Sequence, residues 1–155
     1  MRESQVRIRM LNPPHKATAG SSNDTSLALH LSCGRFSALL AGDMEKGAEA
    51  RLLASTRDAG SLLLKVAHHG SRTGTTEDFV RAVRPRWSVI SAGRNNPFGH
   101  PSPEVVRRLL RHGSRPLLTT DLGAITFETD GERYRLKSHV CGLIESGSLP
   151  ERESR

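Results

Sequence analysis

Short apolar runs alternate with helix-like segments along most of the chain, and this alternation restricts the fold more than any other feature of the sequence. Helices are expected over residues 44–55, from Thr75 or Thr76 onward, and from Ser102 to Gly113, with Pro103 at the first helical position. Strands that alternate with helices typically form a sheet covered by helices. The predicted fold class is therefore α/β. Its strands are expected over residues 6–10, 26–32, 36–41, 62–67, 87–91, 117–120, 124–127 and 134–136.

The length of the chain is that of one domain. With 155 residues it can bury a core without disulfides, and its two cysteines, Cys33 and Cys141, form no C-x-x-C motif. No apolar run approaches the about 20 residues needed to span a bilayer, so we expect a soluble chain without membrane contact of its own. We expect one domain over residues 1–145 and a disordered polar tail over 146–155.

The chain is basic, with 23 Lys and Arg against 16 Asp and Glu and a net charge of +7. Much of the excess is arginine, which suits bidentate recognition of phosphate. A basic surface that only keeps the chain soluble has the same composition, and from charge alone we favour that interpretation.

Polar residues follow the ends of two apolar strands. Asp43 follows residues 36–41 through a glycine, and can either cap the next helix or bind metal, since a carboxylate can bridge two ions. His68 and His69 follow residues 62–67, and neutral imidazole is a common ligand of zinc. Adjacent histidines on extended backbone point to opposite sides, so we expect at most one of them to face a given metal.

Two further loops are candidates for binding an anion. The loop from Gly70 to Thr76 contains Ser71 and Arg72 and leads into a helix, so it can cradle a phosphate or simply be a flexible loop with a threonine cap. A second loop holds Asn96 and places His100 between a glycine and a proline, which limits its positions. Neither a Walker motif nor a G-x-S-x-G motif is present.

Five segments, in this order and spacing, resemble the C-terminal domain of the ComEC family of competence DNA-uptake proteins, within the metallo-β-lactamase superfamily. The resemblance covers about residues 23–131, most of the chain. It is carried by Asn-Asp-Thr-Ser-Leu at 23–27, Leu-Leu-Ala-Gly-Asp-Met-Glu at 39–45, Leu-Lys-Val-Ala-His-His-Gly-Ser at 64–71, Asn-Pro-Phe-Gly-His-Pro at 96–101 and Thr-Asp-Leu-Gly-Ala-Ile at 120–125.

The resemblance implies roles for individual residues. Asp43 matches the bridging carboxylate, and His69 is the first choice for a later metal ligand, with His68 close behind. His100 matches a histidine that contacts the scissile phosphate, and Ser71, Arg72 and Asn96 lie on the loops that would bind substrate. The implied chemistry is phosphodiester hydrolysis of DNA with one or two Zn²⁺ or Mn²⁺ ions, in which a bound water is acidified to a pKa near about 7.

The chain departs from the superfamily in one respect, because the His-x-His-x-Asp-His signature is absent. The resemblance therefore implies only the C-terminal half of an αββα sandwich, either as a fragment or as a separately encoded, degenerate half. Such a half has few ligands, so we expect little activity and a bound metal only together with the missing N-terminal half. We also expect an exposed sheet edge or face, with a tendency to self-associate. The parent protein is expected in the cell membrane with this domain extracytoplasmic.

The alternative interpretation is a metal-free module that binds nucleic acid without catalysis. It would hold the backbone through basic side chains near the two loops and on the third helix: Arg72, Arg94, Arg107, Arg108 and Arg111.

Overall fold

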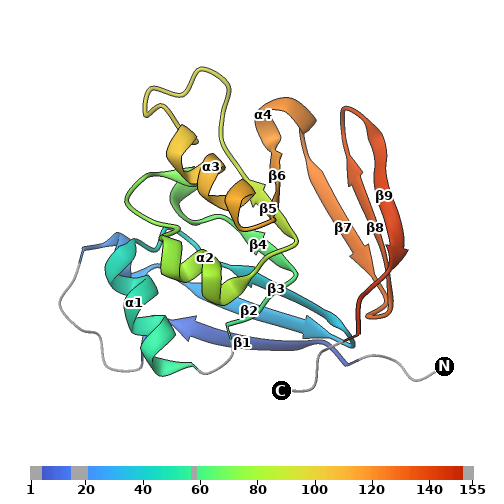
Figure 1. Cartoon of the computed structure of the whole chain (residues 1–155), viewed down its shortest axis with the longest axis horizontal. Coiled ribbons are helices and arrows are strands. Elements are labelled where there is room, and N and C mark those ends of the chain that lie inside the picture. Colours follow the sequence, from blue (N-terminus) through green and yellow to red (C-terminus); the bar gives the residue numbers. More distant parts are fainter. Residues whose placement is uncertain (1–4, 15–20, 57–58, 152–155) are drawn as a thin grey trace.

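A computed structural model describes residues 5–14, 21–56 and 59–151 (Figure 1). Its larger sheet has six strands in the order β1-β2-β3-β4-β5-β6. The first three are antiparallel neighbours, whereas β3 to β6 run parallel. These strands are β1 (Arg7–Asn12), β2 (Ala28–Cys33), β3 (Phe36–Leu40), β4 (Leu63–Lys65), β5 (Trp87–Ile90) and β6 (Arg115–Leu118).

The remaining strands form a second, antiparallel sheet in the order β7 (Ile125–Thr129), β8 (Arg133–Ser138) and β9 (Gly142–Ser148). The helices are α1 (Lys46–Ser55), α2 (Glu77–Val83), α3 (Pro103–Arg111) and the short α4 (Thr119–Leu122). Two 3₁₀ turns, η1 (Asn23–Thr25) and η2 (Ala67–Gly70), lie in the loops.

The elements stack in three layers (Figure 1). Helices α1, α2 and α3 cover one face of the larger sheet, where Leu39, Leu64 and Ile90 pack with helix residues such as Phe79 and Leu109. The second sheet covers the opposite face with an aromatic core: Phe36, Trp87, Phe127 and Tyr134. The central strands β3, β4 and β5 therefore contribute apolar side chains to the cores on both faces of the sheet.

The parallel strands place the predicted site at one edge of the sheet. Strands β3, β4 and β5 are neighbours and run in the same direction, so the residues that follow them come together. These are Asp43 after β3, His68 and His69 after β4, and Ser91 after β5.

The α/β class predicted from the sequence is confirmed, but several boundaries were wrong. The strand expected over residues 117–120 ends at Leu118, and Thr119 begins α4. The strand β9 was not predicted, and it extends into the expected disordered tail: residues 146–148 pair with β8, and Leu149 is buried. Residues 152–155 of that tail lie outside the described residues. Pairing with β8 supplies the order that the polar sequence of β9 does not indicate.

The four-layer αββα sandwich stays a prediction. On the outer face of the second sheet, Thr126, Glu128 and Arg135 are exposed and Lys137 pairs with Glu128 at 2.8 Å, while the exposed Leu143 lies beside Lys137. Within the described ranges, no helix is long and apolar enough to cross a membrane.

An exposed sheet edge lies at β1, an edge strand of the larger sheet. Ile8 is 62% exposed and Met10 52% exposed on one face of β1. Because Phe127 of β7 stacks on Phe36 of β3 with ring centroids 4.8 Å apart, the second sheet begins over β3 and leaves this part of the larger sheet uncovered.

Glu145 of β9 joins the two sheets. Its carboxylate accepts hydrogen bonds from the Tyr134 hydroxyl at 2.5 Å, from Arg86 at 2.6 Å, from the Trp87 indole at 3.4 Å and from Arg115 at 3.0 Å. The hydrogen bond from Tyr134, followed by those from Trp87 and Arg86 and the charge of Arg86, lowers the pKa of Glu145 although burial opposes this. The ionised carboxylate is therefore the form that stabilises the contact.

We expect Glu145→Gln to lower the free energy of unfolding by about 2 kcal/mol at pH 7. Because the folded-state pKa is lowered, this contribution is present above the unfolded pKa and is lost as the pH falls through the folded value. Urea unfolding at pH 7, 5 and 3 should show the variant and the unchanged protein converging toward low pH. Glu132→Gln, at an exposed position, serves as the control. If Glu145→Gln lowered the free energy of unfolding equally at all three pH values, the stabilising role of the ionised carboxylate would be wrong.

Candidate functional site

Asp43 does not cap helix α1, because Asp24 accepts a hydrogen bond from the first turn of that helix. Helix α1 begins at Lys46, and the Ala48 amide in its first turn donates to Asp24 Oδ1 at 3.1 Å. Gly42 lets the chain leave β3 in a left-handed conformation with φ +56°, where a Cβ would lie 2.6 Å from the Leu27 carbonyl oxygen. The Asp43 carboxylate therefore does not cap α1, and its side chain is 45% exposed at the sheet edge. Of the two interpretations of Asp43, the capping one was wrong.

His68 and His69 lie on a strained turn. Both have left-handed backbones, with φ +45° and +55°, which is costly for residues with a Cβ. The His68 amide donates to the Gly42 carbonyl oxygen at 3.0 Å, which fastens this turn to the end of β3. The extended backbone assumed from the sequence was wrong, so the two rings are not on opposite sides: their centroids lie 6.4 Å apart at 66°.

The ring of His69 is oriented toward Asp43 by the neighbouring strand. Its Nδ1 lies 2.6 Å from the Ser91 carbonyl oxygen, which can only accept, so Nδ1 carries the proton. The other nitrogen, Nε2, lies 3.9 Å from Asp43 Oδ1 and is the one that carries the lone pair in the neutral tautomer. A backbone carbonyl that fixes one ring nitrogen is the usual support of a metal-binding histidine.

His68 belongs to a different network. Its Nδ1 lies 3.5 Å from Glu45 Oε1, and the same oxygen accepts from Thr73 Oγ1 at 3.1 Å and from Asn23 Nδ2 at 3.2 Å. Asn23 lies in one of the segments that carry the resemblance, and its amide holds Glu45. These contacts make His68 the less suitable of the two histidines as a partner for Asp43.

His100 completes a group of three imidazoles. Asn96 holds the loop, since its amide donates to the His100 carbonyl oxygen at 2.6 Å and its carbonyl oxygen accepts the His100 amide at 2.9 Å. The His100 ring lies 5.7 Å from that of His68 and 5.9 Å from that of Phe98. Burial, followed by the nearby His68 and His69, lowers the pKa of His100. Its imidazole is therefore neutral at pH 7.

A shallow recess of about 280 Å³ opens beside these side chains. It exposes the imidazoles of His69 and His100 together with the ring of Phe98, whereas Asn96 lines it mainly with an amide already bonded to its own loop. Asn96 thus positions its own loop, and its contact with substrate stays a prediction.

The donors present fit part of a metal site. Asp43 Oδ1 and His69 Nε2 at 3.9 Å are within reach of one ion, since each Zn²⁺ bond measures about 2.0–2.2 Å. Within residues 5–14, 21–56 and 59–151, however, no three His, Cys, Asp or Glu side chains gather closely enough to hold an ion. Catalytic zinc sites have three protein ligands, so a complete site needs at least one donor from elsewhere.

The predicted phosphate cradle at residues 70–76 is filled by the protein itself. The Thr75 amide donates to Glu49, and the Thr76 amide and hydroxyl donate to Glu49 Oε2 at 2.9 and 2.7 Å. Ser71 is buried and bonds to Thr73 within the loop at 3.0 Å, so its predicted contact with substrate is not supported by its position. Arg72 stays exposed at the rim of the loop.

The five arginines proposed to bind nucleic acid in the alternative interpretation differ in exposure and in their partners. The Arg108 side chain is only 12% exposed, and it donates to the Thr75 carbonyl oxygen at 2.7 Å and to Glu104 at 2.7 Å. Arg111 pairs with Glu77 at 3.1 Å, and Arg94 donates to the Thr120 carbonyl oxygen at 2.6 Å. Arg107 is exposed. Arg108 is therefore the least accessible of the five arginines, and its guanidinium is engaged in internal contacts.

Two residues at the site were not predicted. Glu45 holds His68 and Thr73, and Lys65 of β4 lies near Asp43: burial lowers the pKa of Lys65, and the Asp43 carboxylate opposes this. Both lie inside the segments that carry the resemblance, but their types are common at helix starts and strand ends. No signal in the sequence separated them from ordinary surface residues.

No protein-family model matches the chain. Three curated bacterial proteins are similar to it over most of its length. It is 36% identical to ComE operon protein 3 of Bacillus subtilis over 82% of the chain, 38% identical to Recombination protein 2 of Haemophilus influenzae over 65%, and 36% identical to Competence protein ComA of Neisseria gonorrhoeae over 79%.

The chain spans only a small part of these proteins, namely 16%, 13% and 18% of their respective lengths. The resemblance seen in the motifs is thereby supported, while the metallo-β-lactamase fold stays a prediction. The chain is accordingly a relative of competence-related bacterial proteins, similar to one short segment of each.

Proposed function

We propose that the chain is the C-terminal part of a divalent-metal-dependent phosphodiesterase that acts on DNA during uptake. The observation that carries the proposal is the pair formed by Asp43 and His69, in which the Ser91 carbonyl oxygen fixes the ring so that Nε2 faces the carboxylate at 3.9 Å. A carboxylate and an oriented neutral imidazole are donors that Zn²⁺ or Mn²⁺ accepts.

In this proposal each residue of the site has a defined task. Asp43 and His69 would hold the ion, and a bound divalent ion supplies Lewis-acid activation of water and of a phosphoryl oxygen. His100, whose imidazole is neutral at pH 7, can donate one hydrogen bond to a phosphate oxygen and accept a proton on its other nitrogen. Lys65 offsets part of the negative charge of Asp43 when no ion is bound.

The missing ligands would come from an N-terminal half packed on the uncovered part of the larger sheet. Ile8 and Met10 are exposed there, and β7, whose Phe127 stacks on Phe36 of β3, is an edge strand of the second sheet. Added strands could pair with β7 and bury these side chains. In the absence of such a half, the same apolar surface would favour self-association. We also propose that the whole protein lies in the cell membrane with this part extracytoplasmic.

DNA uptake enters the proposal through one relative, which is named a competence protein. The alternative function, a metal-free module that binds nucleic acid, is favoured by the net charge of +7 and by the presence of only two facing donors among the described residues. The two functions differ in their response to a chelator.

Metal content and cleavage together test the proposal. The chain, and a longer protein that joins it to an N-terminal half, would be dialysed against Mn²⁺ or Zn²⁺ and assayed on labelled single- and double-stranded DNA. We expect metal binding and EDTA-sensitive cleavage in the longer protein, and at least about a hundredfold less cleavage by the chain alone, since second-shell losses already cost about 10–100-fold. A longer protein that binds DNA equally well with EDTA but neither binds metal nor cleaves would overturn the hydrolase and leave the module.

A further inference from the structure

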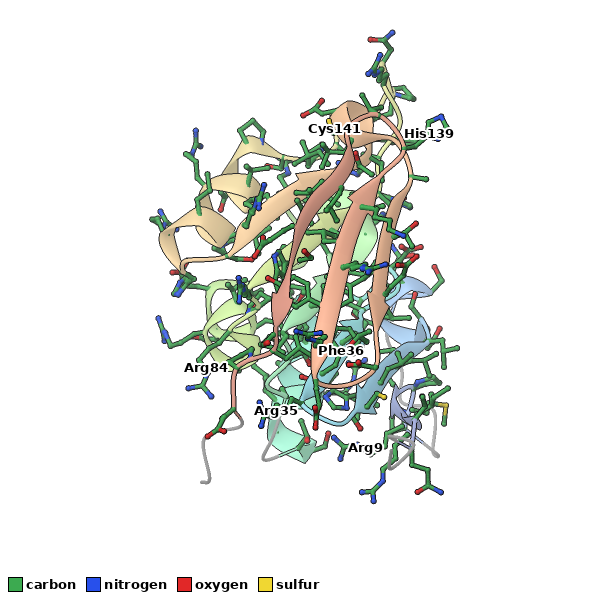
Figure 2. The ribbon with its side chains drawn as sticks, turned by 90° about the vertical axis from the view of Figure 1, so that its right-hand side faces the viewer. Arg9, Arg35, Phe36, Arg84, His139 and Cys141 are labelled. Atoms are coloured by element: carbon green, nitrogen blue, oxygen red, sulfur yellow. The ribbon has the colours of Figure 1, made fainter. Side chains whose placement is uncertain are left out.

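A second polar hollow lies at the end of the larger sheet opposite His68, His69 and His100. It measures about 560 Å³, and the arginines at its rim are Arg7, Arg9, Arg35 and Arg84. Figure 2 shows Arg9, Arg35 and Arg84 along the lower end of the molecule, far from His139 and Cys141 at the top. We call this hollow the arginine pocket.

The pocket is separate from the histidine site because it lies at the other ends of the parallel strands. Arg35 precedes β3 and Leu62 precedes β4, whereas Asp43 and the histidines follow these strands. Strand β3 has 5 residues, so the two ends lie about 15 Å apart at about 3.3 Å per residue.

The alternating sequence of β1 builds the floor of the pocket. Arg7 and Arg9 point to the same side of the strand, and their partners across the sheet are Ser32 and His30. Ser32 in turn pairs with Ser37 of β3. The small serine side chains leave the hollow open beneath the long arginine side chains.

Among the described residues, four arginines and one carboxylate line the pocket. Arg35 pairs with Glu151 at 3.4 Å, and Glu151 is the one acidic residue that lines the pocket among the described residues. Within the same part of the chain, no ion pair or hydrogen bond of the side chains of Arg7, Arg9 or Arg84 is found. Guanidinium groups stay protonated at any physiological pH, so the pocket always attracts anions.

Phosphate is the anion that fits such a pocket best. The planar guanidinium offers paired donors that match phosphate oxygens. Arg7 and Arg9 are two residues apart on an extended strand, so their Cα atoms lie about 6.8 Å apart. This spacing is similar to that of successive phosphates in an extended polynucleotide. A row of arginines along an open hollow suits a chain of phosphates better than a single ion.

We infer that the arginine pocket binds the phosphodiester backbone of single-stranded nucleic acid. The inference rests on the proposed function only in taking nucleic acid as the ligand. Its residues are distinct from Asp43, His69 and His100, so binding at the pocket and cleavage at the histidine site can fail separately.

The test measures binding of a fluorescent single-stranded oligonucleotide to the full chain in EDTA, so that no cleavage intervenes. Arg7→Gln combined with Arg9→Gln should weaken binding about tenfold at low salt and reduce the slope of log K against log salt concentration by about 1.4, or about 0.7 for each lost phosphate contact. Arg84→Gln on the opposite wall should act in the same direction with about half the loss of slope.

The matched control is Arg133→Gln combined with Arg135→Gln, which removes the same charge from exposed positions on β8. It should change the affinity less than twofold. Equal weakening by both double variants, with urea midpoints unchanged, would assign binding to net charge and overturn the inference.

A competition arm distinguishes the source of the phosphate. Unlabelled oligonucleotide should displace the probe, whereas a nucleoside monophosphate at the same concentration of phosphate should not. Equal displacement by the monophosphate would mean that the pocket takes small phosphates, and the inference of a backbone site would fail. Loss of cleavage by Asp43→Asn with normal oligonucleotide binding would support both the proposed hydrolase and a separate binding pocket.

Discussion

Asp43→Asn is expected to lower metal-dependent DNA cleavage about a thousandfold in the protein that contains the complete site, which corresponds to about 4 kcal/mol of activation free energy. Asn keeps the shape of Asp but loses the charge that attracts a divalent ion. The fold should be unchanged, because Asp24 rather than Asp43 caps α1 through the Ala48 amide. The measurements are kcat/KM on a labelled oligonucleotide and Mn²⁺ affinity by calorimetry.

The two histidines provide the internal comparison. His69→Gln should approach the loss seen for Asp43→Asn, because its Nε2 faces the carboxylate. His68→Gln should cost less, since His68 contacts Glu45 and Thr73 instead. Asp78→Asn on α2, whose side chain is 80% exposed, is the matched control for loss of one carboxylate. If Asp43→Asn cleaves as well as the Asp78 variant does, the proposed hydrolase is wrong.

Glu49→Ala is expected to destabilise the fold by about 4 kcal/mol, because it leaves buried donors without an acceptor. Glu49 is 0% exposed, and its carboxylate accepts from the Thr75 amide and from the amide and hydroxyl of Thr76. Burial raises the pKa of Glu49, and the hydrogen bonds from Thr76 and Thr75, with the charge of Arg108, oppose that rise. Urea unfolding of the chain at pH 7 measures the loss.

A milder variant keeps this prediction testable if the alanine variant does not fold. Thr76→Val removes the hydroxyl that donates to Glu49 and accepts from the Phe79 amide, and should cost about 1–2 kcal/mol. Asp78→Ala, two residues further along and exposed at the surface, should change stability by less than about 0.5 kcal/mol. Equal unfolding midpoints for the Glu49 and Asp78 variants would show that the internal carboxylate does not hold the loop.

The sequence predicted the order of most elements because buried strands and helices carry apolar residues in regular patterns. The apolar runs around Leu39, Leu64 and Ile90 became the central strands, and the Ser-Pro-Glu start of α3 lies where it was expected. Strand β9 shows no such periodicity, since Leu143 is exposed, Glu145 is half-buried, and most of its other positions are glycine or serine. Its order comes from pairing with β8 and from Glu145, both of which are contacts distant in sequence.

Within the site, residue type and spacing selected Asp43, His68, His69 and His100, and the loops do bring these side chains to one edge of the sheet. They could not indicate which histidine faces Asp43, because that depends on the Ser91 carbonyl oxygen, which follows a different strand. They also could not indicate that Asn96 and Ser71 are used inside their own loops.

The sequence by itself determined the α/β class, the strand ends that carry polar residues, and the resemblance to competence-related proteins, since these depend on local periodicity and on motifs. Only the tertiary structure decided that the loop at residues 70–76 donates its hydrogen bonds to Glu49, and that Asp43 is left to face His69. It also decided that four arginines from β1, the β2–β3 turn and the end of α2 meet in one pocket. The physical reason is common to all three: each depends on a hydrogen bond or a charge contributed by a segment far away in the sequence.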